Sequence, residues 1–169
     1  MKIVIIGAGE VGFHVAKSLS ELDYDISVID IDHAKCSRAN EHLDVIVNQG
    51  NGSDEKLLKN INVADADYVF CLTNSDETNL ISSLQCHNLG AKKIIARLRD
   101  LDYSRNGNAI PPEKFGVDMV IHPEKEVAKE IIRLVKHPYA DKFYEFEGGK
   151  AVLFSKKINQ ILYSTLSII

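Results

Sequence analysis

Short apolar runs alternate with longer stretches of helical periodicity along the chain. Six apolar runs predict buried strands at residues 2–6, 25–30, 44–50, 66–73, 92–98 and 118–123. The first helical stretch places one set of apolar residues on a single face, namely Val11, Val15, Leu19 and Leu22. Strands that alternate with helices indicate right-handed βαβ units and a parallel sheet that is covered on both faces.

These elements fill about 140 residues. We therefore predict an α/β fold, a doubly wound, six-stranded parallel Rossmann sheet of order 3-2-1-4-5-6 with helices on both faces. Further helices are predicted at 33–43, 53–61, 75–90 and 124–138, with Gly90 as a C-cap and Pro138 as a stop. The last helix carries an apolar face, formed by Val127, Ile131, Leu134 and Val135. A loop before the sixth strand contains Asn106, Gly107, Pro111 and Pro112.

The end of the chain follows a different pattern. Residues 143–154 alternate like a strand pair around Gly148 and Gly149, and residues 155–169 have only weak periodicity. We expect residues 1–140 to form the Rossmann domain. Residues 141–169 are then a linker with a strand extension and the truncated start of a following domain, unless this end packs on a partner.

Composition narrows the class of protein. The chain has 169 residues, of which 45% are hydrophobic and 26% are charged, as in soluble globular proteins. A net charge of -4 disfavours both nucleic acid and an anionic membrane surface as direct partners. The three cysteines form no CxxC pair, which favours reduced, buried thiols. No signal peptide opens the chain and no apolar run reaches the roughly 20 residues of a membrane helix, so we expect a cytoplasmic protein without direct membrane insertion.

A glycine-rich turn follows the first strand and opens the first helix, with the sequence GAGEVG at residues 7–12. Gly7 allows the tight turn, Gly9 lets a diphosphate approach the backbone, and Gly12 lets the helix pack on the sheet. The N–H groups at the helix start and the helix dipole attract phosphates. The predicted cofactor-binding residues here are Gly7, Ala8, Gly9, Glu10, Val11 and Gly12. The alternative is a tight βα turn that binds nothing.

Asp30 ends the second strand, 18 residues after Gly12. A carboxylate at that place accepts hydrogen bonds from both ribose hydroxyls and repels a 2′-phosphate, which favours NAD over NADP. We include the neighbouring Ile31 in the predicted site. Asp32 supports the ribose or starts the next helix, and we disfavour a metal site formed by the two acids.

Polar residues also follow the third, fourth and fifth strands. The loop after the third strand suits an adenine edge, with Asn51, Gly52 and Ser53. The segment after the fourth strand lies at the switch point of the sheet, where ligands bind, and its predicted site residues are Thr73, Asn74, Ser75 and Glu77. Glu77 and Asp76 also suit the first turn of a helix.

Arg97 and Arg99 share a face of the fifth strand, and Arg97 is the better candidate for a phosphate contact; a surface ion pair is its alternative. His122, near the end of the sixth strand, is a loop histidine rather than a base.

Together, GAGEVG, VIDID, QGNGS, LTNSDETN, ARLR and IHPE resemble the TrkA family over about residues 1–147. TrkA proteins are the peripheral subunits of bacterial Trk potassium-uptake systems, built from RCK domains, also called KTN domains. The resemblance implies binding of NAD or NADH, alternatively ATP or ADP, in a dimeric or tetrameric ring beneath a membrane potassium transporter or channel. It assigns Gly7, Gly9, Gly12, Asp30, Thr73 and Arg97 to the nucleotide site, whereas Asn51 stands where many relatives carry aspartate.

The sequence favours a nucleotide sensor over an enzyme. A dehydrogenase needs a substrate pocket and an acid/base group beside the nicotinamide, and neither a second domain nor a Tyr-x-x-x-Lys pair is visible. The position of Gly12 fits dinucleotide binding better than a methyltransferase. The alternatives are a fragment of an NAD-dependent oxidoreductase and an assembly module whose nucleotide is only structural.

Overall fold

The computed structural model describes residues 1–100, 111–138, 142–146 and 151–155. The chain divides into two compact units, Met1–Pro123 and Glu124–Ile169. The predicted loop at Asn106 and Gly107 and the turn at Gly148 and Gly149 lie outside the described residues.

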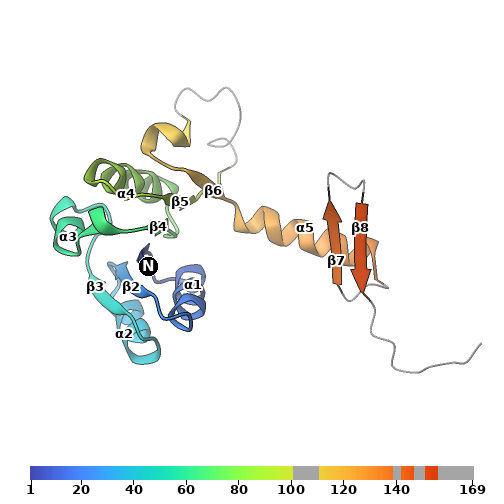
Figure 1. The fold of residues 1–169 in the computed structure, drawn as a ribbon, viewed down its shortest axis with the longest axis horizontal. Coiled ribbons are helices and arrows are strands. Elements are labelled where there is room, and N and C mark those ends of the chain that lie inside the picture. The colour runs from blue at the N-terminus through green and yellow to red at the C-terminus, as the bar shows by residue number, and fades with distance from the viewer. Residues whose placement is uncertain (101–110, 139–141, 147–150, 156–169) are drawn as a thin grey trace, which may run out of the picture. The chain divides into compact units, whose positions relative to one another are not determined.

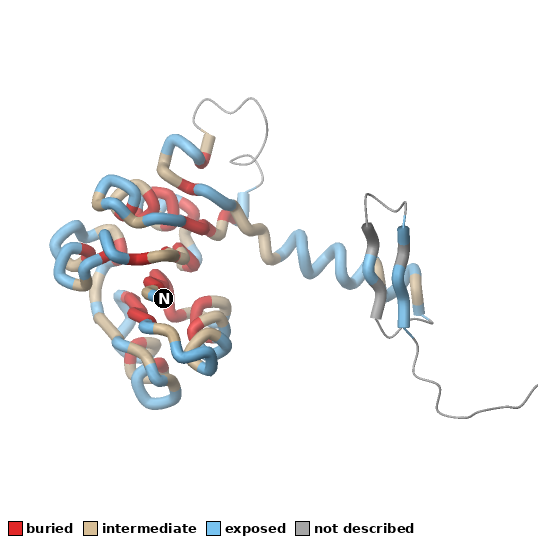
Figure 2. Tube along the Cα trace, viewed as in Figure 1, coloured by how far each residue is buried: buried red, intermediate tan, exposed pale blue. Residues whose placement is uncertain are grey.

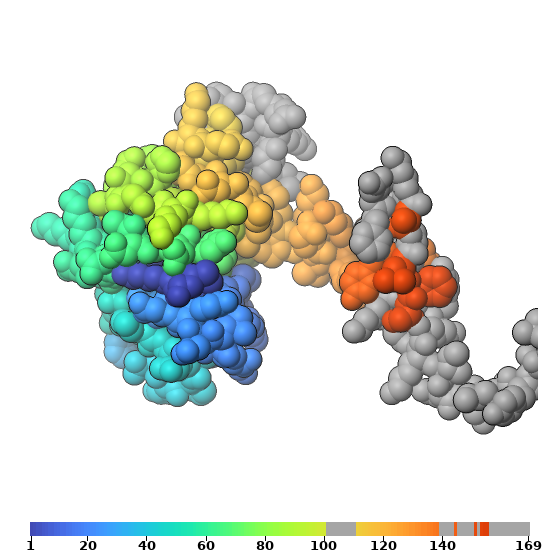
Figure 3. Space-filling view, in the orientation of Figure 1, coloured from blue at the N-terminus to red at the C-terminus, as the bar shows by residue number. Residues whose placement is uncertain are grey.

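The first unit is built on a parallel sheet of order β3-β2-β1-β4-β5-β6, which confirms the predicted topology (Figure 1). Its strands are β1 (Lys2–Ile6), β2 (Asp25–Asp30), β3 (Ile46–Gln49), β4 (Tyr68–Cys71), β5 (Ile94–Arg97) and β6 (Met119–Ile121). The space-filling view shows β1, in dark blue, in the middle of this unit. Residues before the crossover from β3 to β4 lie on one side of it, and residues after the crossover lie on the other (Figure 3).

Five α-helices and two short 3-10 helices connect the strands within the described residues. They are α1 (Glu10–Ser20), α2 (His33–His42), α3 (Glu55–Asn60), η1 (Val63–Asp65), α4 (Asp76–Leu89), η3 (Pro112–Phe115) and α5 (Pro123–Lys136). Helix α1 contacts β1 and β2, whereas α4 contacts β4 and β5. No described helix has both the length and the apolar character needed to cross a bilayer.

Strand β1 is buried on both faces because α1 packs on one face of the sheet and α4 on the other (Figure 2). Ile3 and Ile5 pack in one hydrophobic cluster with Ala16 of α1. Val4 and Ile6 belong to a second cluster that includes Leu80 of α4. This double burial explains why the strand reads as a continuous apolar run rather than as an alternating one.

The second unit contains α5 from Glu124 onward and an antiparallel pair, β7 (Lys142–Phe146) and β8 (Ala151–Ser155). The pairing confirms the strand pair predicted from residues 143–154. Helix α5 has no buried residue, and half or more of each large apolar side chain on it is exposed, including Val127, Ile131, Leu134 and Val135.

Candidate functional site

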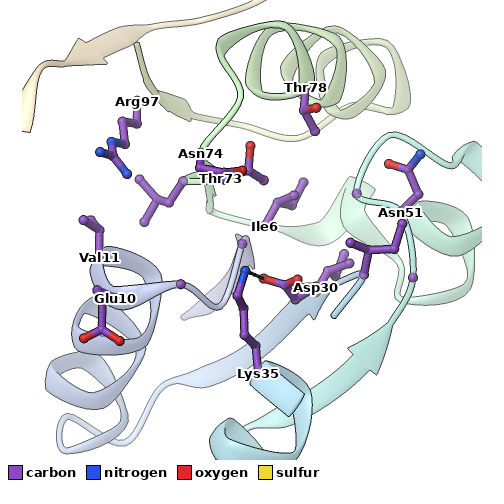
Figure 4. Close-up of a pocket in the computed structure, with 17 residues that line it drawn as sticks. Ile6, Glu10, Val11, Asp30, Lys35, Asn51, Thr73, Asn74, Thr78 and Arg97 are labelled. Carbon is purple, nitrogen blue, oxygen red and sulfur yellow. Dashed lines mark ion pairs between the residues drawn. The ribbon is translucent and has the colours of Figure 1, made fainter. Parts of the chain in front are cut away.

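The candidate site is a cavity of about 320 Å³ at the carboxyl edge of the sheet (Figure 4). Strands β1, β2 and β4 end at one level there, because Ile6 pairs with both Ile29 and Cys71. After β1 the chain continues toward β2, and after β4 it continues in the opposite direction, toward β5. The loops that follow β1 and β4 therefore diverge and leave a crevice between them. A cavity of this size is at the lower end of the range that binds small ligands.

The cavity collects most of the residues that the sequence predicts for the site. The predicted residues that line it are Gly7, Gly9, Glu10, Val11, Asp30, Ile31, Asn51, Gly52, Thr73, Asn74 and Arg97. Those that do not line it are Ala8, Gly12, Ser53, Ser75 and Glu77. They contact or support the lining residues, as described below.

The three glycines of the turn are held by different constraints. Gly7 has φ +105°, and a Cβ there would lie 2.8 Å from the backbone nitrogen of Thr73. At Gly12 a Cβ would lie 1.8 Å from the carbonyl oxygen of Gly7, so the helix packs directly on the turn. A Cβ at Gly9 would meet nothing within 4 Å. Gly9 therefore faces open space, and the other two glycines are required by packing.

The N-terminus of α1 differs from those of the next three α-helices. Asp32, Asp54 and Ser75 each accept a hydrogen bond from a backbone N–H in the first turn of α2, α3 and α4. Among the described residues, no side chain caps α1, which begins after Gly9. Its first residues, Glu10 and Val11, line the cavity, where the N–H groups of a first helical turn and the positive end of the helix dipole suit an anion.

Asp30 is buried beside this turn. Its Oδ2 accepts a hydrogen bond from the Ala8 N–H at 2.7 Å, and its Oδ1 accepts one from the Asp32 N–H at 2.9 Å. A carboxylate has about four lone-pair positions, so acceptor capacity remains for ribose hydroxyls. Asp32 itself caps α2 through the Ala34 N–H, which supports the helix-start interpretation of that residue.

Lys35 is a lining residue that the sequence analysis missed. Its Nζ lies 4.0 Å from a carboxylate oxygen of Asp30 and 4.0 Å from one of Asp32. The ammonium group offsets part of the negative charge around the predicted ribose position. The signal was available, because a lysine in the first turn of α2 follows the acid by only five residues.

The loop after β3 is shaped by its own polar contacts. The Asn51 carbonyl oxygen Oδ1 accepts hydrogen bonds from the Ser53 N–H at 3.0 Å and from its hydroxyl at 2.8 Å. A Cβ at Gly52 would lie 2.1 Å from a methyl carbon of Ile6. Ser53 therefore orients Asn51, and Gly52 lets the loop pack against β1 at the floor of the cavity.

Thr73, Asn74 and Arg97 form the opposite side of the cavity (Figure 4), and we call these three residues the phosphate rim. The Arg99 guanidinium donates to the Asn74 carbonyl oxygen at 3.2 Å rather than lining the cavity. Ser75 caps α4 and donates its hydroxyl to Glu77, whose pKa is lowered by a hydrogen bond to its own backbone N–H and by Ser75. Ser75 and Glu77 thus shape the helix start behind the rim.

Glu10 brings a negative charge to the cavity lining, and Arg38 of α2 pairs with it. The Arg38 guanidinium nitrogen lies 2.6 Å from Glu10 Oε1, and the guanidinium stacks 4.0 Å from the centroid of the Phe13 ring. The hydrogen bond and the charge of Arg38 lower the pKa of Glu10. Glu10 is therefore ionised at neutral pH, with its charge offset by Arg38.

The remaining lining residues that sequence reasoning missed are mostly apolar. They are Ile6, Ile29, Gly50, Leu72 and Thr78. Ile6, Ile29 and Leu72 stand at or just beyond the ends of strands, so the predicted carboxyl edge could have identified them. Thr78 lies in the first turn of α4 and carried no separate signal.

Other candidate chemistry is absent from the site. No group of three or more metal-ligating side chains occurs in the described part of the chain. His122 Nδ1 contacts the Leu98 carbonyl oxygen instead of lining the cavity. All three cysteines are buried and free, as predicted. Burial raises the pKa of the Cys71 thiol to about 12.

Residues 3–123 match the model of the TrkA-N domain family. The chain is 35% identical over 158 residues to a Trk system potassium uptake protein TrkA homolog from Archaeoglobus fulgidus, covering 94% of this chain and 36% of that protein. It is also 35% identical over 158 residues to the Trk system potassium uptake protein TrkA from Halomonas elongata, covering 93% and 35%. The chain thus spans about a third of the length of these relatives.

Solved structures show the same fold at lower identity. The TrkA-N domain of the inner membrane protein ybaL from Escherichia coli matches with a TM-score of 0.68 and 19% identity, covering 79% of this chain and 96% of that one. A GsuK channel bound to NAD matches with a TM-score of 0.65 and 17% identity, covering 86% of this chain and 25% of that one.

Proposed function

The chain belongs to the TrkA-N domain family, and on that premise we propose that it is a nucleotide-sensing regulatory domain of a potassium uptake system. It binds NAD or NADH, alternatively ATP or ADP, in the cavity between β1 and β4. It acts in the cytoplasm on a Trk-type membrane transporter or channel, as part of a homo-oligomer, and it binds the nucleotide without transforming it.

One observation carries the proposal. The N-terminus of α1 has no side-chain cap in the described structure, and it opens beside Gly9, where an added Cβ meets nothing within 4 Å. Asp30 lies on one side of this opening and Arg97 on the other, and both line the cavity. The arrangement offers an acceptor for ribose, backbone donors for a diphosphate and a cation for its charge.

The relatives support the potassium-transport part of the proposal. The curated relatives carry names of Trk potassium uptake proteins, and a channel that shares the fold was solved with NAD. Regulation requires that a ligand have different affinities for two conformational states, since a ligand with equal affinity for both shifts nothing. The proposed sensor therefore needs two nucleotides that stabilise different states of the oligomer.

The first test is calorimetric titration of the purified chain with NADH, NAD⁺, ATP, ADP and NADPH. Selective binding that Gly9→Val abolishes would support the site, because the larger side chain fills the space that a diphosphate needs. Gly50→Val is not a suitable control, since a Cβ there would lie 2.7 Å from Leu57. Lys17→Ser, on the last turn of α1, is a suitable one. Absence of binding by all five nucleotides contradicts the proposal.

The second test addresses transport. Potassium flux is measured in vesicles that hold a Trk-type membrane subunit, with the chain added in the presence and absence of saturating nucleotide. Identical flux in both conditions contradicts a regulatory role. Steady oxidation of NADH by a small carbonyl compound would instead favour an oxidoreductase.

A further inference from the structure

We propose that Asn79, which does not line the cavity, is a positioning residue that sets the selectivity of the site for phosphorylated over unphosphorylated adenosine. The inference rests on the proposed nucleotide site and adds a residue that acts through the phosphate rim. Asn79 lies in α4 and is fully buried at 0% exposure.

The side-chain amide of Asn79 connects two segments that are distant in sequence. Its Oδ1 accepts hydrogen bonds from the Thr73 N–H at 2.9 Å and from the Thr73 hydroxyl at 2.7 Å. Its Nδ2 donates to the Thr73 carbonyl oxygen at 3.1 Å and to the Arg97 carbonyl oxygen at 2.8 Å. All four hydrogen-bonding positions of the amide are thereby used on the backbone and hydroxyl of the rim.

The hydrogen bond from Asn79 to the Arg97 carbonyl oxygen fixes the backbone position from which the Arg97 side chain extends. Strand β5 ends at Arg97, so the backbone there has no further ladder to hold it against β4. The Asn79 amide ties that strand end to Thr73, the first residue of the rim. Without this tie, the guanidinium and the Thr73 hydroxyl lose their fixed separation, and a bidentate contact with phosphate oxygens becomes less favourable.

A second brace acts just beyond the first and has a different target. The Asp76 carboxylate accepts hydrogen bonds from the Arg99 N–H at 3.0 Å and from the Asp100 N–H at 2.8 Å. These contacts hold the chain after the rim, whereas Asn79 holds the rim itself. The two side chains share the first turns of α4, which explains why this helix begins with polar residues that are buried rather than exposed.

The adenosine side of the cavity does not depend on Asn79. Asp30 is held by backbone groups of Ala8 and Asp32, and Asn51 is held by Ser53. These residues belong to β2 and to the loop after β3. Loss of Asn79 is therefore expected to weaken the binding of phosphate groups and to leave the binding of adenosine unchanged.

The experiment compares the dissociation constants of ADP and adenosine for wild type and Asn79→Ala. A destabilised protein has a smaller binding-competent fraction, which raises both apparent constants by the same factor. The ratio of the two constants is therefore independent of the folded fraction. We expect the preference for ADP over adenosine to fall by about tenfold or more, the change that corresponds to loss of a charge-assisted hydrogen bond.

Ser83→Ala is the matched control. Ser83 is buried one turn further along α4, and its hydroxyl donates to the Asn79 carbonyl oxygen at 2.7 Å without contacting the rim. This variant should lower the thermal midpoint and keep the wild-type ratio. Asn79→Asp is a second variant of nearly the same shape, in which an oxygen faces the Thr73 and Arg97 carbonyl oxygens, and its ratio should also fall.

The outcomes separate the two proposals. A wild-type chain that binds neither ADP nor any other nucleotide contradicts the proposed function. A wild-type chain that prefers ADP, together with Asn79 variants that keep this preference, overturns the role of Asn79 and leaves the function intact. If neither Asn79 variant folds, the amide is a requirement of the fold rather than of selectivity, and the inference is also overturned.

Discussion

Asp30 Oδ2 accepts a hydrogen bond from the Ala8 N–H at 2.7 Å, so the acid at the end of β2 holds the glycine turn after β1. Ala8 is fully buried, and this contact satisfies a backbone group that water cannot reach. The residue expected to contact ribose therefore also shapes the turn expected to hold the diphosphate. A simple loss of binding in an Asp30 variant would not distinguish these two roles.

We predict that Asp30→Ala reduces the preference for NADH over NADPH in addition to its effect on stability. The variant leaves the Ala8 N–H without its acceptor, which costs roughly 1–3 kcal/mol of the free energy of unfolding. It also removes the charge that repels a 2′-phosphate. Calorimetry with both dinucleotides measures the ratio, which does not depend on the folded fraction.

Asp54→Ala is the control for this prediction. The substitution removes the same type of charged group from the N-cap of α3, where Asp54 accepts a hydrogen bond from the Lys56 N–H. Asp54 does not line the cavity. Its stability should fall by about 1 kcal/mol, with an unchanged ratio. An unchanged ratio in Asp30→Ala as well would rule out contact between Asp30 and the ribose.

Gly9→Ala is expected to lower nucleotide affinity, whereas Gly12→Ala is expected to lower the stability of the fold. At Gly9 the new methyl group meets open space, so the free energy of unfolding should stay within about 1 kcal/mol of wild type, while nucleotide affinity falls. At Gly12 the methyl group would lie 1.8 Å from the Gly7 carbonyl oxygen, which should destabilise the fold by about 1–3 kcal/mol. Urea unfolding and calorimetry measure the two quantities. Equal losses of stability in both variants would contradict the assigned roles.

Much of the fold could be predicted from the sequence because the strands of a doubly wound sheet are short, apolar and separated by helices. The ends of the elements were less predictable. Strand β3 was predicted at 44–50 and spans Ile46–Gln49, because it lies at the edge of the sheet and pairs only with β2. Strand β6 was predicted to reach residue 123 but ends at Ile121, because Pro123 opens α5.

Site residues could be predicted where the residue type and its spacing determine the contact with the ligand. They could not be predicted where a side chain acts through other residues without lining the cavity. The glycine turn and Asp30 have a fixed spacing, which the sequence shows directly. Asn79 is the last residue of the LTNSDETN segment, but that segment did not indicate its role, because the sequence alone does not show which polar residues of α4 are buried. In the same way, the sequence shows the apolar face of α5 but does not show what packs against that face.

The exposed apolar face of α5 predicts self-association. Ile131 is 56% exposed and Val135 is 75% exposed, and an apolar face of this kind marks an interaction surface. Ile131→Asp should weaken self-association by about tenfold or more, the loss expected when one aliphatic side chain can no longer be buried. Light scattering across a concentration series measures it, with Lys129→Ser as the control. A wild-type chain that stays monomeric at every concentration would contradict the proposed homo-oligomer.

The ion pair between Glu10 and Arg38 predicts an electrostatic effect on phosphate binding. Arg38→Ala removes the guanidinium from the Glu10 carboxylate in the cavity lining and leaves the His14 ring, 3.9 Å away, as its remaining partner. ADP affinity should therefore fall several-fold, and the loss should shrink as salt screens the charge. Glu10→Gln combined with Arg38→Ala should restore the affinity, because no uncompensated charge remains.

Since the pKa of Glu10 lies below its ordinary value of 4.5, the carboxylate stays ionised across the neutral range. The pair should be lost only as the pH falls through that lowered pKa. A double variant that binds no tighter than Arg38→Ala would show that Arg38 acts through another contact.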